Sequence, residues 1–280
     1  MSLHPRETHD FTHARQKLRK LRAERPAGRK SRLARAIVIN VSVFACVPLL
    51  ACAAIIPACS SSPPSTEETP SGTAIAPLDP TGVHYGKSYA EWQSEWYRWF
   101  FGAPGSTHPI LDATGVHCAV NQNPSSPVFF LGGTVGGKAS RKCQIPKGKA
   151  IFFPIINAGV DNGGVPPAEV LTEPQLLAAA TGAMKDAKVT ASLDGKDIPD
   201  LARYLVPPTR FNYTVPPGDN LYRANGTEGV SGLIEPVFAT GFYLLLPPLA
   251  RGVHQLKFYG SNVSAGQTFV TDVTYELSYE

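Results

Sequence analysis

The sequence predicts a mainly β domain, an antiparallel and jelly-roll-like β-sandwich that carries two helices, one of them rich in tryptophan. The chain contains 26 Pro and 25 Gly, and many of them separate short apolar runs, as turn residues separate strands. The final run alternates between two faces from Phe269 to Tyr279, which is the period of a half-buried strand. No alternation of strands with helices and no internal repeat is evident, so a doubly wound parallel sheet is not expected.

The first predicted element of the domain is a helix over 89–101. Ser88 and Glu91 have the spacing of a capping box, and Gly102 is expected to end the helix in the left-handed conformation. The three tryptophans of the chain are spaced by four and three residues, so they lie along one face of this helix: Trp92, Trp96 and Trp99.

Two apolar runs, 127–133 and 148–157, are bounded by Gly and Pro and predict strands that are buried on both faces. The glycine-rich stretch 132–138 lacks the Lys-Ser/Thr ending of a phosphate-binding loop, so we expect a hairpin loop there. A second helix is predicted after Thr172, with Pro174 in its first turn. Its apolar stripe is expected to consist of Leu176, Leu177, Ala180 and Met184.

The remaining elements are predicted to be strands. Residues 188–193 alternate between apolar and polar side chains and then meet Asp194 and Gly195, a pair that accepts positive φ in a tight hairpin turn. Three further strands are expected at 240–248, 252–260 and 267–280.

The first 58 residues predict an export signal or a membrane anchor. Residues 1–35 contain eleven Lys or Arg and three acidic residues, and residues 36–58 contain no charged side chain. A basic stretch followed by an apolar stretch and small residues is typical of a secretory leader, and this one resembles a bacterial lipoprotein signal. Lipid would be attached to Cys59 or to Cys52. An uncleaved anchor is the alternative, because about 20 apolar residues span a bilayer core.

Residues 59–81 are rich in Ser, Thr and Pro and predict a tether, which leaves 82–280 as a single domain. The domain is expected outside the cytoplasm, held by the N-terminal anchor at the cell envelope or the cell surface. The chain has 26 basic and 22 acidic residues. The excess of basic residues lies in the leader, so the rest of the chain has a net negative charge. Nucleic acid is therefore not an expected partner.

Cys118 and Cys143 are expected to form a disulfide. If Cys59 carries the lipid, the mature chain keeps these two cysteines alone, an even number that suits an oxidising compartment. A zinc site is the alternative, but neither cysteine has a second Cys or His at the short spacing that zinc sites usually have.

The row of tryptophans has three interpretations. Its face can pack on a sheet as part of the core, which an aromatic stripe at helical spacing usually does. It can also be a platform on which sugar rings stack, or a face that seeks the membrane interface. Solvent access to Trp96 separates the first interpretation from the other two.

Other candidate functional residues are few, and no nucleophile, cofactor or metal motif is present. Asn157 and Asp161 follow a predicted buried strand, where loops often bind ligands or calcium. Three residues, His108, Asp112 and His117, could form a metal or acid–base cluster if the loops bring them together. Glu91 and Glu95 lie one helical turn apart and could form a carboxylate pair of the kind found in glycosidases.

A combination of segments in 82–280 resembles a family of uncharacterised exported bacterial proteins. These segments are YGKSYAEWQSEWYRW, ILDATGVHC, SPVFFLGGT, CQIPKGKAIFFPIIN and LPPLARGVHQLKFYG. The resemblance implies a secreted domain with a Trp-rich helix and a two-cysteine β-rich core, and it indicates no particular activity, substrate or site. We therefore expect a lipoprotein that binds a small molecule or a carbohydrate and needs no cofactor. The alternative is an extracellular hydrolase or a metal-dependent enzyme.

Overall fold

The computed structural model describes residues 75–264 and 267–280. The predictions for the leader, for Cys52 and Cys59, and for most of the tether lie outside these residues. The end of the expected tether contacts the domain, because the Leu78 N–H donates to the Leu245 carbonyl (2.8 Å) and the Tyr89 hydroxyl donates to the Leu78 carbonyl (2.7 Å). The contacts of the domain therefore begin upstream of residue 82.

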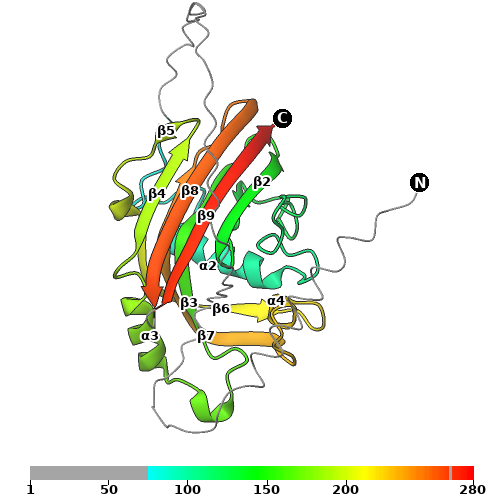
Figure 1. The fold of residues 1–280 in the computed structure, drawn as a ribbon, viewed down its shortest axis with the longest axis vertical. Coiled ribbons are helices and arrows are strands. Elements are labelled where there is room, and N and C mark those ends of the chain that lie inside the picture. Colours follow the sequence, from blue (N-terminus) through cyan, green and yellow to red (C-terminus); the bar gives the residue numbers. More distant parts are fainter. Residues whose placement is uncertain (1–74, 265–266) are drawn as a thin grey trace, which may run out of the picture. The chain divides into compact units, whose positions relative to one another are not determined.

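Two β-sheets dominate the described residues, as predicted for a mainly β chain. The strands are β1 Val128–Phe130, β2 Gly137–Ile145, β3 Ala150–Val160, β4 Lys188–Leu193, β5 Lys196–Asp197, β6 Leu205–Val215, β7 Gly232–Leu246, β8 Gly252–Ser264 and β9 Gln267–Tyr279. The α-helices are α2 Tyr89–Gly102, α3 Glu173–Gly182 and α4 Leu221–Ala224. One sheet has the order β1-β3-β7-β6 and the other the order β2-β9-β8-β4-β5 (Figure 1). The short helix α4 adds to the two predicted helices.

Two strand pairs are parallel, so the expectation of an entirely antiparallel arrangement is wrong. β1 runs parallel to β3, and β2 runs parallel to β9 along its whole length. The stretch 132–138 is likewise not a hairpin loop, because it leads from β1 in one sheet to β2 in the other. Gly136 and Gly137 turn the chain there with φ of 120° and 85°, a region that glycine enters without strain.

The hairpin between β4 and β5 is confirmed. Asp194 and Gly195 connect the two strands with φ of 51° and 75°, as the tight turn requires. Two strands have no counterpart among the predictions, β2 and β6. β6 contains Pro207 and Pro208, and its pairing with β7 shifts register between Val206 and Thr209. Such an interruption hides the period of two in the sequence.

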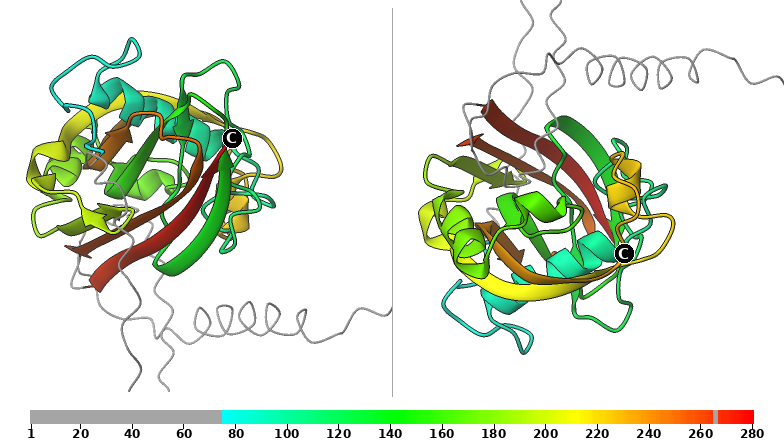
Figure 2. Two further views of the ribbon diagram at one scale, coloured as in Figure 1. Left: turned by 90° about the horizontal axis from the view of Figure 1, so that it is seen from above. Right: turned by 90° about the horizontal axis from the view of Figure 1, so that it is seen from below.

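The core lies on both faces of β3, which is why this strand is apolar nearly throughout. On one face, Phe153 meets Phe258 of β8 with ring centroids 5.0 Å apart. On the other, Phe152 stacks on Tyr243 at 5.2 Å and meets Tyr89 of α2 at 5.8 Å. The paired strands β8 and β9 lie on one side of the domain, and β6 lies on the opposite side with α2 packed beside it (Figure 2).

Both predicted helix starts are confirmed, but the predicted end of α2 is wrong. Ser88 and Glu91 form the capping box of α2, and Thr172 and Gln175 form that of α3. The helix α2 runs through Gly102 without positive φ, and the chain leaves it extended at Ala103. A Cβ on Gly102 would lie 3.1 Å from Asn121 Nδ2, so glycine at this position permits a close approach rather than a turn.

The apolar stripe of α3 is narrower than predicted. Leu176, Ala180 and Met184 are buried, whereas Leu177 is 41% exposed. Within the described part of the chain, no helix has the length and apolar character needed to cross a bilayer.

Candidate ligand-binding pocket

The tryptophan face of α2 belongs to the core. Trp92, Trp96 and Trp99 are 3%, 2% and 5% exposed, and each indole N–H donates to a backbone carbonyl at 2.9 Å. These carbonyls belong to His84, Leu131 and Val120. Rings buried in this way form no exposed platform for a sugar or a membrane interface, so the core interpretation is the one that the structure supports.

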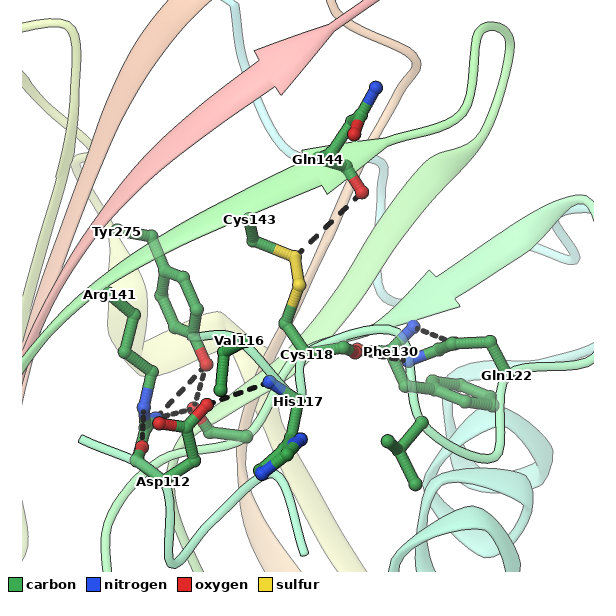
Figure 3. The surroundings of a disulfide bond; sticks show 12 residues. Asp112, Val116, His117, Cys118, Gln122, Phe130, Arg141, Cys143, Gln144 and Tyr275 are labelled. Carbon is green, nitrogen blue, oxygen red and sulfur yellow. Dashed lines mark hydrogen bonds between the residues drawn. A yellow bond between two sulfur atoms is a disulfide. The ribbon is translucent and has the colours of Figure 1, made fainter. Parts of the chain in front are cut away.

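Cys118 and Cys143 form the predicted disulfide, with their Cα atoms 5.9 Å apart (Figure 3). The bond ties the loop before β1 to β2. Beside it, the buried guanidinium of Arg141 donates to the carbonyls of Asp112 (2.6 Å) and Gly133 (2.7 Å) and to the Tyr275 hydroxyl (3.0 Å). The hydrogen bonds beside the disulfide therefore hold separate backbone segments together.

His108, Asp112 and His117 do not form a metal or acid–base cluster. His108 is 1% exposed, its Nε2 bonds the Phe100 carbonyl at 2.8 Å, and its Nδ1 accepts from the Ile110 N–H at 3.2 Å. Burial lowers the pKa of His108 to about 4 and keeps the ring neutral. The Asp112 carboxylate accepts from the backbone N–H groups of Thr114 and His117, which makes it a turn residue (Figure 3).

The two glutamates of α2 also have structural roles. Glu91 accepts from the Ser88 backbone and hydroxyl at the start of the helix. Glu95 pairs with Lys87 at 2.6 Å and with Arg98 at 3.3 Å on the surface. Across residues 75–264 and 267–280, no group of three His, Cys, Asp or Glu side chains could hold a metal ion.

A cavity of about 100 Å³ lies at the end of β3. Asn157 and Asp161, the two polar residues predicted to bind a ligand there, both line it. α2, β8, β9, α4 and the loop between β1 and β2 contribute to its wall. Its aromatic side chains are Trp96, Tyr97, Phe100, Phe101, Tyr222 and Phe269. Its polar side chains include Thr134, Asn157, Asp161 and Asn262. The structure thus brings Asn157, Asp161 and Trp96 together and leaves Trp92 and Trp99 outside.

Asn157 is held by two tyrosines. Its Nδ2 donates to the hydroxyls of Tyr97 and Tyr243, each at 3.0 Å, so both amide hydrogens are used. Glycine permits the close packing of these groups. A Cβ on Gly159 would lie 2.9 Å from the Tyr97 ring, and one on Gly241 would lie 2.6 Å from Asn157 Cβ.

Asp161 accepts hydrogen bonds on both carboxylate oxygens. Oδ2 accepts from the Tyr213 hydroxyl at 2.8 Å, and Oδ1 accepts from the Gly163 N–H at 2.7 Å. The Tyr222 hydroxyl lies 3.4 Å from Oδ1 and 2.6 Å from the Tyr213 hydroxyl. Burial raises the pKa of Asp161, because removal from water disfavours the charged form more than these donors restore it.

Asn262 lines the same cavity from β8 and is 7% exposed. Its Nδ2 donates to the Ala183 carbonyl, whereas its buried Oδ1 accepts no hydrogen bond from the described part of the chain. Neither Asn262 nor Tyr222 was predicted to belong to a site. No local pattern marks them, because their role depends on contacts with β3, which is distant in the sequence.

The chain matches no protein-family model and no curated protein.

Proposed function

We propose that this chain is an exported bacterial lipoprotein of the cell envelope or surface, and that its domain binds a small ligand in the pocket at the end of β3. The observation that carries the proposal is a cavity with aromatic walls that is also lined by Asn157, Asp161 and Asn262. Concave, mostly apolar sites with a few placed polar groups are typical of ligand-binding pockets. We also propose that the domain is a β-sandwich of jelly-roll type, which its two sheets and their mainly antiparallel strand pairs support.

The size of the cavity limits what it can hold. A cavity of about 150 Å³ holds one benzene molecule, so about 100 Å³ has room for on the order of four non-hydrogen atoms. A carbohydrate would enter it with one substituent or one edge of the ring. The aromatic walls would then contact C–H groups, and the amides and the carboxylate would orient the polar ones.

The anchored, extracytoplasmic location is supported by the order of charge and hydropathy in residues 1–58 and by the disulfide. Disulfides persist in oxidising compartments and are rare in the cytosol. Under this proposal the mature chain begins at an acylated Cys59 or Cys52, and mass spectrometry of its N-terminus decides between them and an uncleaved anchor.

Ala158→Leu tests the pocket, because Ala158 lines it and is buried. We expect the added side-chain volume to abolish binding on a glycan array and in small-molecule titrations that detect binding to the wild-type chain. Ala119→Leu, at an exposed position outside the pocket, is the matched control and should bind as the wild type does. Wild-type affinity in a folded Ala158→Leu variant would contradict the proposal.

The hydrolase alternative has one observation in its favour. Asp161 combines a raised pKa with two tyrosine hydroxyls beside a cavity, and perturbed carboxyls gather at catalytic sites. Glycosidases, however, use a pair of carboxylates, and Asp161 is the one acidic residue among the described residues of this wall. We therefore favour binding over catalysis.

A further inference from the structure

We infer that the group bound in this pocket is a small protonated amine, held by the Asp161 carboxylate and the Asn262 carbonyl oxygen among aromatic rings. The inference rests on the proposed function and names the chemistry of its ligand. Among carbohydrates, an amino sugar carries a protonated amine of this kind.

The charge of the wall favours a cation. Asp161 is the one charged side chain that lines the cavity in the described part of the chain, and no Lys, Arg or His is among the lining residues there. An anionic ligand would meet a carboxylate and no compensating positive charge. An ammonium group meets an opposite charge in surroundings of low dielectric, where the attraction is stronger than in water.

The hydrogen-bonding groups of the wall favour a ligand that only donates. The Asn157 amide hydrogens are already donated to Tyr97 and Tyr243, and the Asn262 amide donates to the Ala183 carbonyl. Asn262 Oδ1 is a buried acceptor without a donor in the described residues, and both Asp161 oxygens are acceptors. An ammonium group has three donors and no acceptor, which matches this set.

Aromatic side chains make up much of the cavity wall, and aromatic rings attract ammonium groups. Phe101 stacks on Tyr213 with centroids 3.9 Å apart and on Tyr222 at 5.7 Å, so the rings next to Asp161 are held in place. Trp96, Tyr97 and Phe269 line the cavity as well. Ring faces attract cations through their quadrupole, and the attraction strengthens when water is excluded. Burial raises the pKa of Asp161, and no Lys, Arg or His of the described residues is among the groups that lower it.

The test uses three probes of similar size and different charge: propylammonium, 1-propanol and propanoate. Each is titrated against the full chain in a non-ionic detergent, and saturation-transfer NMR measures binding. We expect propylammonium to bind at least tenfold more tightly than 1-propanol, and propanoate not to bind. Equal or tighter binding of 1-propanol or propanoate would overturn the inference and leave the ligand-binding function intact.

Two pocket variants and one control locate the effect. Asp161→Asn removes the charge and Asn262→Leu removes the unpaired acceptor, and each should weaken propylammonium binding at least tenfold. Asp194→Asn neutralises a carboxylate that pairs with His254 outside the pocket, and it should bind as the wild type does.

Far-ultraviolet circular dichroism identifies any variant that fails to fold, in which case the other pocket variant decides. Should all three probes fail to bind the wild-type chain, the ammonium inference is wrong, and the Ala158→Leu comparison on glycans still decides the proposed function separately.

Discussion

At the scale of single residues, buried polar groups in this domain are bonded mainly to the backbone. The three indole N–H groups donate to carbonyls, and the Arg141 guanidinium donates to the Asp112, Gly132 and Gly133 carbonyls and to a tyrosine hydroxyl. A buried donor without a partner costs about 1–3 kcal/mol, so such bonds decide whether a polar residue can lie in the core. Gln93 and Asn262 depart from this pattern, because Gln93 Oε1 and Asn262 Oδ1 are buried acceptors without a donor in the described residues.

His108 makes the stability of the domain depend on pH. Its folded pKa, about 4, is lower than the ordinary value of 6.5, so the neutral ring stabilises the fold above pH 6.5 and this contribution is lost as the pH falls towards 4. We expect the free energy of unfolding to decrease over this interval by about 3 kcal/mol more in the wild type than in His108→Gln, at 1.4 kcal/mol per pKa unit. Urea unfolding at intervals between pH 7 and pH 4 measures the difference. Parallel curves for the two proteins would show that His108 titrates normally.

At the scale of elements, local chemistry predicted where the helices begin, and contacts between elements decided how they end. The capping boxes at Ser88 and Thr172 need only residues three positions apart. The end of α2 at Gly102 depends instead on the approach of Asn121, which the helix sequence does not contain. The hairpin at Asp194 was predictable for the same local reason, whereas β6 was not, because its paired prolines interrupt the alternation.

Gly260 tests how closely the two sheets approach each other. A Cβ on Gly260 of β8 would lie 2.6 Å from Ile156 Cβ and 2.9 Å from the Ile155 carbonyl of β3, in the other sheet. We expect Gly260→Ala to lower the free energy of unfolding by about 1–3 kcal/mol, the usual cost of overpacking a core. Gly182→Ala is the matched control, because its Cβ would meet nothing within 4 Å at the end of α3. That variant should be neutral or more stable by up to about 1 kcal/mol, since alanine favours the helix. Equal effects in thermal or urea unfolding would contradict the packing argument.

At the scale of the whole molecule, the disulfide joins segments that the sheets do not connect directly. Cys118 lies in the loop before β1, and Cys143 lies on β2 at the edge of the five-stranded sheet. The bond closes a loop over a separation of 25 residues, for which the loop-entropy model gives about 3 kcal/mol.

We expect the double variant Cys118→Ser, Cys143→Ser to lose about this amount of stability in urea unfolding, and the wild type to lose as much when it is reduced. Adding a reductant to the double variant should change nothing, which is the control. An unchanged stability in the reduced wild type would mean that the loop is held by its other contacts, among them those of Arg141.

The sequence by itself determined the mainly β class, the two longer helices, the hairpin and the cysteine pair, because these depend on neighbours in the chain or on composition. It also indicated Asn157 and Asp161 as polar residues after a buried strand, although only Asp161 follows β3 and Asn157 lies within it. Only the tertiary structure decided which strands share a sheet, that two pairs are parallel, and that the tryptophans lie in the core. The pocket belongs to this second group, because its polar side chains, Asn157 and Asn262, come from different sheets. The physical reason is that pairing and burial depend on contacts between segments far apart in the chain, and no local pattern of residues encodes those partners.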